Sequence, residues 1–184
     1  PLLVKACIER FQAGVQILLD SKADPNLQTD IVGMKGANAL AIAVAMGIHG
    51  NVKCLLDAGA APNSLARTTG EKIHAGGSEA MSATVLTVAA ANHDHEVARL
   101  LLSKKADPNL QFADGYCPLA AAINSTRPER LATIGLLLRH KADPNTHIGG
   151  WTPLCCSTKQ QGDASDVMQV LLQHNADPNV VCQA

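Results

Sequence analysis

One four-residue sequence, Ala-Asp-Pro-Asn, recurs along this chain and constrains its architecture more than any other feature. It occurs at 23–26, 106–109, 142–145 and 176–179, and a degenerate copy, Ala-Ala-Pro-Asn, occurs at 60–63. A pair of leucines precedes every copy, always at the same distance in sequence. The asparagines of successive copies are 37, 46, 36 and 34 residues apart. A period of this length predicts stacked supersecondary units rather than one globular core.

The composition is typical of closely packed layers of small helices, and it excludes several classes of function. Aromatic residues make up only 2% of the 184 residues although 47% are hydrophobic, so Ala and Leu must fill the interior. The net charge of −1 gives no electrostatic footprint for nucleic acid or an anionic membrane. The sequence has no apolar run of about 18 residues, so we expect no insertion into a membrane.

One unit shows how a repeat folds. Residues 84–90 predict a short apolar helix that Thr84 opens as N-cap, and residues 92–94 predict a turn. Residues 95–104 predict a second helix, because apolar residues recur there at helical spacing. Pro108 then ends the unit, since proline clashes with a continuing helix, and the flanking Asp and Asn favour a turn.

These residues resemble the ankyrin repeat. That family reads Thr-Pro-Leu-His-x-Ala-Ala, a turn, a Leu-Leu-rich helix and Gly-Ala-Asp-x-Asn. Here 116–122 (Tyr-Cys-Pro-Leu-Ala-Ala-Ala) and 151–154 (Trp-Thr-Pro-Leu) match the opening, and 38–43 and 1–6 are weaker copies. The resemblance implies an all-α solenoid, in which helix–turn–helix layers stack and β-hairpin fingers project to one side.

The resemblance divides the whole chain into five units of a single array. We place them at about 1–28, 29–65, 66–111, 112–147 and 148–184. A long finger insertion falls at about 64–83, and we expect the array to be a fragment of a longer protein or array, because both ends lack a polar cap.

The glycine that the family has before Ala-Asp is present only as Gly59. The other units have Lys22, Lys105, Lys141 and Asn175 there. Because this position often needs a left-handed backbone, we expect these four residues to cost some stability.

Two clusters could carry chemistry. The tetrad 93–96 (His-Asp-His-Glu) could hold a metal, or it could form the polar turn between two helices. Cys155 and Cys156 could bind a soft metal or oxidise, or they could simply replace residues at the start of a helix. We favour the structural interpretation of both clusters and expect no metal, no cofactor and no enzymatic activity. We also interpret the six cysteines as reduced thiols in an intracellular protein, with the cytoplasm as the expected compartment.

In the resembled fold, partners bind the concave face made by the finger tips and the first helices. The only Tyr and the only Trp, Tyr116 and Trp151, occupy equivalent positions one repeat apart. Aromatic residues are common interface anchors, but these rings could instead pack against neighbouring fingers and stiffen the stack. The remaining candidate partner-binding residues are Phe112, Asp114, His147, Asn124, Lys159, Met46, Arg67 and Lys72.

We therefore predict a non-catalytic module that binds another protein and no nucleic acid. Two alternatives keep the fold: an accessory subunit built into a large assembly, and an ankyrin segment of a larger enzyme or channel. The size and apolar character of the buried interface would separate the first alternative from a binding module.

Overall fold

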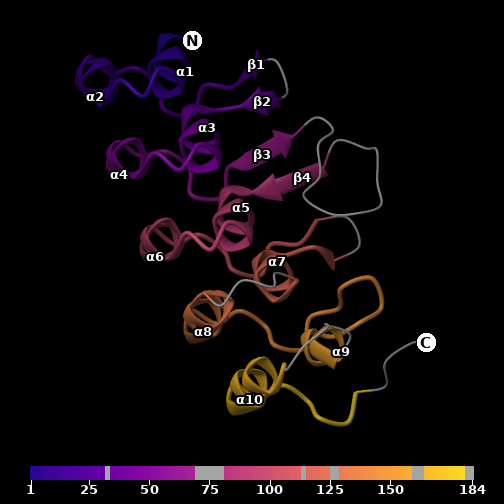
Figure 1. Ribbon diagram of the computed structural model, residues 1–184. Coiled ribbons are helices and arrows are strands. Elements are labelled where there is room, and N and C mark those ends of the chain that lie inside the picture. The colour runs from indigo at the N-terminus through magenta and orange to yellow at the C-terminus, as the bar shows by residue number, and fades with distance from the viewer. Residues whose placement is uncertain (32–33, 69–80, 113–114, 125–128, 159–163, 181–184) are drawn as a thin grey trace.

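The helices of this chain stack in two parallel rows, and the strands project from one of those rows (Figure 1). The computed structural model describes residues 1–31, 34–68, 81–112, 115–124, 129–158 and 164–180. Side chains at 34–35, 67–68 and 81–82 are not described. Within these ranges, no helix is long and apolar enough to cross a membrane.

The inner row consists of five short helices that stack on one another in chain order. They are α1 (Leu2–Ile8), α3 (Ala39–Ala45), α5 (Val85–Ala91), α7 (Pro118–Ile123) and α9 (Pro153–Thr158). Asn38 and Thr84 open α3 and α5 by accepting hydrogen bonds from the amides of Ala41 and Thr87, at 2.9 and 3.0 Å. The predicted N-cap of the third unit is therefore confirmed, and it satisfies an amide that the helix itself leaves unpaired.

The outer row consists of the second helix of each pair. Its members are α2 (Gln12–Asp20), α4 (His49–Asp57), α6 (His95–Ser103), α8 (Arg130–Arg139) and α10 (Ser165–Gln173). Each packs against the inner helix that precedes it in sequence and against its neighbours in the outer row. In α6, Val97 and Leu101 are buried whereas Arg99 and Ser103 are exposed, as the helical spacing predicts.

The core between the two rows is aliphatic. Its largest fully buried side chains are Leu, Ile and Val residues, among them Leu40, Leu55, Leu86 and Leu137. The three middle inner helices, α3, α5 and α7, are almost entirely buried along their length; α5, for example, has six buried residues of seven. Small side chains on both rows let the helices approach closely, which explains why a chain with few aromatic residues can still fill its interior.

The projecting strands form a continuous four-stranded sheet that the sequence did not predict. Strands β1 (Thr29–Ile31), β2 (Met34–Ala37), β3 (Leu65–Thr68) and β4 (Met81–Thr84) lie in this order, and all neighbours are antiparallel. Strands β1–β2 and β3–β4 are the expected fingers, and β2 pairs with β3 across two repeat units, with Met34 opposite Thr68. The long insertion thus begins and ends in a β-ladder, and its residues 69–80 lie outside the described part of the chain.

The Ala-Asp-Pro-Asn turns bond to one another along the edge of the outer row. Within a turn, the aspartate accepts from the asparagine amide, as Asp107 does from Asn109 at 2.9 Å. Between turns, Asn109 accepts from the amide of Asp143 at 2.7 Å and donates to the carbonyl of Lys141 at 2.8 Å. Corresponding bonds start from Asn26, Asn63 and Asn145. We call this series of side chains the asparagine ladder; it joins all five layers.

The residue before each turn has a left-handed backbone. Gly59 has φ of 88°, and Lys22, Lys105, Lys141 and Asn175 have φ between 63° and 69°. The expectation that the family's missing glycine is replaced by residues in a left-handed conformation is confirmed. For a side chain other than glycine this conformation costs about 1–2 kcal/mol.

Candidate protein-binding surface

The fourth and fifth fingers, at residues 110–117 and 146–152, contain most of the described candidate residues. Phe112 and Tyr116 pair across the fourth finger, where the amide of Phe112 donates to the carbonyl of Tyr116 at 2.9 Å. Tyr116 is buried, with 7% of its surface exposed. Burial, and to a smaller extent the neighbouring Cys117, raises the pKa of Tyr116 to about 12, so the hydroxyl stays protonated. Its ring packs into the hydrophobic core, which favours the stacking interpretation of Tyr116 over the anchor interpretation.

The two fingers approach each other most closely at Gly115. Its φ of 76° lies in the left-handed region, and a Cβ atom there would overlap the carbonyl oxygen of His147 in the next finger. Only glycine satisfies both conditions. Gln111 also donates a hydrogen bond to the hydroxyl of Thr146, so the fingers are joined by a close backbone contact and a side-chain bond.

In the fifth finger, the indole of Trp151 is more exposed than the ring of Tyr116 is in the fourth finger. Ile148 and Trp151 exchange two backbone hydrogen bonds, of 2.7 and 3.0 Å, across a tight turn in which Gly149 and Gly150 both have positive φ. This closes the finger with two residues, which the Gly-Gly pair permits. Trp151 is half-buried and His147 is exposed. The structure therefore brings Phe112, Tyr116, His147 and Trp151 together on two bonded fingers.

The other candidates lie elsewhere or outside the described residues. Met46 is half-buried and Asn124 is exposed, and they follow the last residues of α3 and α7, about 10 Å along the inner helices from the fingers. Arg67 lies in β3, but its side chain is not described. Asp114, Lys159 and Lys72 lie outside the described residues. Their assignment to partner binding stays a prediction.

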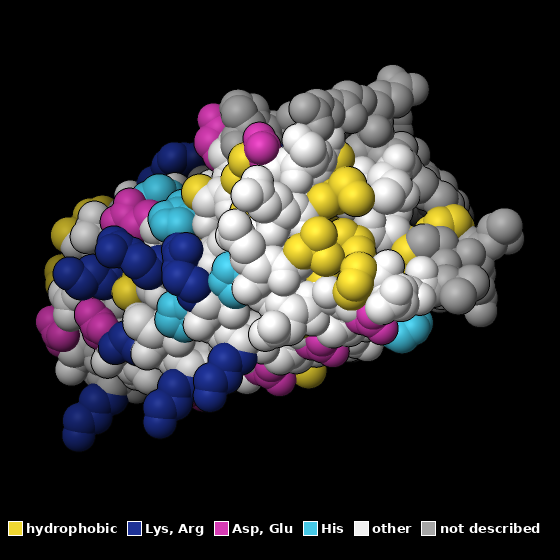
Figure 2. Space-filling model, turned by 90° about the horizontal axis from the view of Figure 1, so that it is seen from below, with side chains coloured by type: hydrophobic (Ala, Val, Ile, Leu, Met, Phe, Trp, Pro, Cys, Tyr) yellow, Lys and Arg dark blue, Asp and Glu magenta, His cyan; other side chains and the backbone are white. Residues whose placement is uncertain are grey.

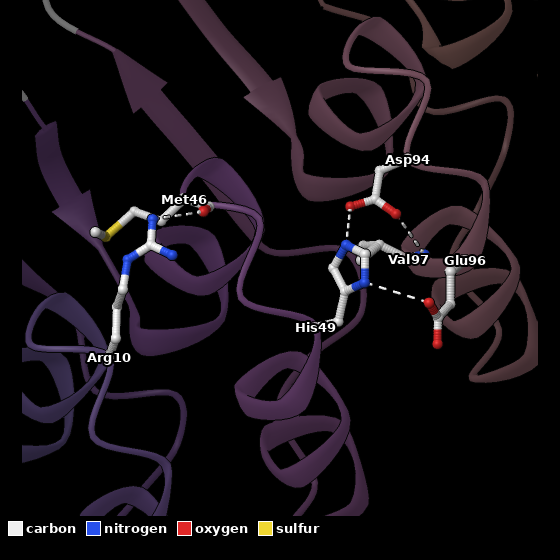
Figure 3. A network of polar contacts seen from close by, with 6 residues as sticks. All are labelled: Arg10, Met46, His49, Asp94, Glu96 and Val97. Carbon is white, nitrogen blue, oxygen red and sulfur yellow. Dashed lines mark hydrogen bonds and ion pairs between the residues drawn. The ribbon is translucent and has the colours of Figure 1, made fainter. Parts of the chain in front are cut away.

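The His-Asp-His-Glu tetrad forms a turn and also joins two layers (Figure 3). Asp94 caps α6 by accepting from the amide of Val97 at 3.1 Å, so the interpretation as a turn is confirmed. His49 at the start of α4 places Nε2 at 2.6 Å from Asp94 and Nδ1 at 3.2 Å from Glu96. The sequence analysis missed His49, because residues 45 positions apart become neighbours only through the stacking of α4 on α6. Among the residues that the structure describes, no group of three His, Cys, Asp or Glu side chains could hold a metal ion.

The cysteines differ from the sequence-based expectation at one position. Cys7, Cys54, Cys117 and Cys156 form no disulfide bond. Cys155 is disulfide-bonded, so the prediction that all six cysteines are reduced is wrong at this residue. Desolvation by burial raises the pKa of Cys7 to about 11, and it raises the pKa of Cys117 as well. These two buried thiols are therefore poor nucleophiles.

A groove of about 870 Å³ lies between α2 and α4 on the outer row. Its lining includes the small residues Gly50 and Cys54 of α4 and Ala58, which follows that helix. The next layer has the larger Leu100 at the position of Cys54, and the hollow between α4 and α6 is smaller, about 490 Å³. The groove carries both signs of charge, from Lys22, Lys53, Asp20, Asp24 and Asp57.

Charge is distributed unevenly between the two sides of the stack. Seen from the α10 end, Lys and Arg side chains gather on the outer-helix side, at the left of Figure 2, and hydrophobic side chains form a separate patch. Exposed basic residues at the ends of α6 and α8 include Lys104, Lys105, Arg139 and Lys141. The described residues of the fourth and fifth fingers include no Lys, Arg, Asp or Glu. The described part of this finger surface thus carries no acidic side chain and no Lys or Arg, and Asp114 lies outside it.

Known proteins with a similar sequence pattern or a similar structure share this architecture. The sequence profile described as ankyrin repeats (3 copies) matches residues 2–111, 65–146 and 86–182. No curated protein matches the chain. Among solved structures, an ankyrin repeat domain from Acinetobacter baumannii AYE is similar to this chain, with a TM-score of 0.76 and 22% sequence identity. The match covers 94% of this chain and 80% of the Acinetobacter chain. At that identity the likeness shows the fold alone, but the profile spans nearly the whole sequence. The chain belongs to the ankyrin repeat family.

Proposed function

We propose that this chain is a non-catalytic module that holds a partner polypeptide against its fourth and fifth fingers. Ankyrin repeats generally act as protein–protein interaction modules. The observation that carries the proposal here is the pair of bonded fingers, which carries a half-buried Trp151, an exposed His147 and a buried Tyr116. In this proposal Tyr116 packs into the core of the stack, and Trp151 makes the contact with the partner.

The chemistry of the fingers indicates what kind of segment they bind. A half-exposed indole gains affinity when a partner covers its remaining apolar area. With no charged side chain among the described finger residues, the complementary segment is expected to be uncharged and apolar, and its binding is expected to depend little on salt. Partner binding through the charged outer row would depend more strongly on salt.

The experiment compares proteins captured by the native chain with those captured by Trp151→Ala/His147→Ala. Both substituted side chains are at least partly exposed, so the variant is expected to keep its fold, which circular dichroism and a thermal melt check. Arg99→Ala/Gln169→Ala, on exposed positions of α6 and α10, is the matched control. A partner lost by the finger variant and kept by the control, identified by mass spectrometry and measured again with purified components, supports the proposal. A partner kept by both folded variants contradicts it.

We also propose that the module works in the cytoplasm. Four cysteines that form no disulfide, each from a different layer, fit a reducing compartment, whereas the disulfide at Cys155 does not. Fluorescence microscopy of the tagged protein tests this. A signal confined to an oxidising compartment would contradict the proposal.

A further inference from the structure

The ends of two outer helices carry a row of exposed basic side chains. Lys104 and Lys105 follow α6, Arg139 ends α8 and Lys141 comes shortly after it, and all four side chains are exposed. Helix α6 packs against α8, so the two pairs lie in neighbouring layers. They belong to the outer-helix side of the stack, where Lys and Arg gather in Figure 2. We call these four residues the basic strip.

Most of the charge of the basic strip is not neutralised by the chain itself. Lys104 pairs with Asp57 of the preceding layer, where its Nζ atom lies 2.8 Å from a carboxylate oxygen. Lys105, Arg139 and Lys141 form no ion pair with another residue in the described part of the chain. These three cations are therefore available to a partner of opposite charge.

The aspartates that follow the strip in sequence are engaged in their own turns. Asp107 and Asp143 accept hydrogen bonds from the amides of Asn109 and Asn145, at 2.9 and 2.8 Å. Each carboxylate thus stabilises the turn after its helix. The two aspartates border the basic strip without pairing with it.

The helix dipole alone does not explain the strip. Cations are favoured at the C-terminal end of a helix, which is a structural reason for Lys and Arg to occur there. The position of Arg139, however, is occupied by Asp20 in α2, by Asp57 in α4 and by Gln173 in α10. The last turns of these three helices contain no basic residue. Since they join the same stack without such cations, the fold does not require the cations of the third and fourth layers.

The backbone fixes the points from which the basic side chains project. Lys105 and Lys141 have φ of 68° and 69°, and the amide of each bonds back to the preceding helix at 3.0 Å. The carbonyl of Lys141 also accepts from Asn109 in the asparagine ladder, at 2.8 Å. The guanidinium of Arg139 lies along α8 over Gly135, where a Cβ atom would be 3.4 Å from Nη1. This arrangement reduces the ordering that binding requires.

The spacing of the strip fits an extended polypeptide. Neighbouring helices pack about 8–10 Å apart, and three residues of an extended chain span about 10 Å. A segment of about four residues can therefore pass from Lys105 to Lys141 and place carboxylates on both layers.

Nucleic acid fits the strip less well than an acidic polypeptide. The net charge of −1 gives no long-range attraction for a long polyanion. Asp107 and Asp143 border the strip and would repel a continuous phosphate backbone. The strip also has no aromatic side chain on which a base could stack. A short acidic segment needs only the local cations.

We propose that the basic strip binds a short, extended segment rich in Asp and Glu, supplied by a partner protein. Carboxylates of that segment accept charge-assisted hydrogen bonds from Lys105, Arg139 and Lys141. The strip belongs to the outer row, whereas the contact proposed at Trp151 belongs to the fingers, so this inference goes beyond the proposed function and does not rest on it.

The test measures the affinity of fluorescein-labelled hexaglutamate for the native chain by fluorescence anisotropy at several salt concentrations. The expected result is saturable binding that weakens as salt rises, because exposed charges are screened. Lys105→Gln/Arg139→Gln is expected to lower the affinity about tenfold, since two exposed ion pairs with the peptide are lost. Lys141→Gln alone is expected to lower it several-fold.

Lys5→Gln/Lys22→Gln is the matched control and is expected to bind hexaglutamate as the native chain does. It removes the same charge from one helical residue and from one residue with a left-handed backbone, as the strip variant does. All four side chains are exposed, so the circular dichroism spectra of both variants are expected to match that of the native chain.

Several outcomes would overturn the proposal. Hexaglutamate that does not bind even at low salt would do so, and so would equal losses in the strip variant and the control, which would indicate an effect of net charge. Oligothymidylate that binds more tightly than hexaglutamate, and is lost in the strip variant, would assign the strip to nucleic acid. Hexaglutamate binding that is lost in Trp151→Ala/His147→Ala would place the acidic segment on the fingers. Absence of binding at the strip would leave the finger proposal standing, because that proposal is tested with other residues.

Discussion

The two long sides of this stack are organised by different rules. On the outer side, every layer ends in the same turn, and the asparagine ladder repeats the same hydrogen bonds from one layer to the next. On the finger side, the fingers of the second and third units form a four-stranded sheet, whereas those of the fourth and fifth units are short hairpins held by isolated bridges. A repeated bond network on one side fixes the spacing of the layers. The other side can then vary in length and side chains without loss of the stack, and such variation is where recognition is built.

The largest effect should come from Gly115 on the finger side. Gly115→Ala combines left-handed backbone strain with overlap between the new Cβ and the carbonyl oxygen of His147. We expect a loss of about 3 kcal/mol in the free energy of unfolding, measured by urea denaturation. Because the fourth and fifth fingers must separate, partner binding at Trp151 should fall as well.

Gly149→Ala is the matched control for that prediction. Gly149 also has positive φ, of 56°, but a Cβ there meets no atom within 4 Å. Only the backbone strain remains, so the loss should be about 1–2 kcal/mol. Equal losses for the two variants would show that the contact between Gly115 and His147 contributes nothing.

A smaller effect is expected from breaking one step of the asparagine ladder. Asn109→Ala removes two hydrogen bonds to the next turn and should cost about 1–2 kcal/mol, since the freed groups are exposed and water replaces part of what is lost. Asn179→Ala is the control, because Asn179 has the same place in the last turn and no following turn within the described residues. If both variants were equally stable, the ladder would not join the layers energetically.

The turn side could be predicted from the sequence because its determinants are local. The Asp-Pro-Asn turn and the left-handed residue before it depend on neighbours within a few residues, and so does the N-cap of α5 at the end of β4. One unit predicted the turn and the N-cap, and the resemblance to the family predicted the left-handed residue. The bonds between turns follow from the same repeat, since stacking places identical asparagines one layer apart.

The finger side could be predicted only in outline, because its contacts join residues far apart in sequence. The pairing of β2 with β3 arises only when layers stack, and so does the proximity of His49 to Asp94 at the start of the outer helices. Tyr116 and Trp151 occupy equivalent sequence positions yet differ in exposure: Tyr116 is buried and Trp151 is half-buried. No pattern within a single unit distinguishes these two rings.

The left-handed residues give a test of smaller magnitude on the turn side. Lys105→Gly should raise the free energy of unfolding by about 0.5–1 kcal/mol, since relief of backbone strain exceeds the added entropy of the unfolded chain. The reverse change, Gly59→Lys, should lower it by a similar amount because Gly59 has the same role in the second unit. Thermal denaturation of both variants measures the pair. A decrease for Lys105→Gly together with an increase for Gly59→Lys would mean that the lysine side chain stabilises the turn by more than its backbone strain costs.

The smallest effect concerns an ion pair between layers on the outer side. The Nζ atom of Lys104 lies 2.8 Å from an Asp57 carboxylate oxygen, and its hydrogen bond and charge lower the pKa of Asp57. A lowered pKa in the folded state means that the pair stabilises the fold above the ordinary pKa of an aspartate, and that this contribution is lost as the pH falls through the folded-state pKa. Lys104→Met should return the pKa of Asp57 toward its ordinary value, which a carboxyl NMR titration measures directly. Because the pair is exposed to solvent, thermal stability at neutral pH should hardly change. A large loss of stability, or an unmoved titration of Asp57, would contradict this picture and would mean that the outer row depends on more than its turns and its apolar contacts.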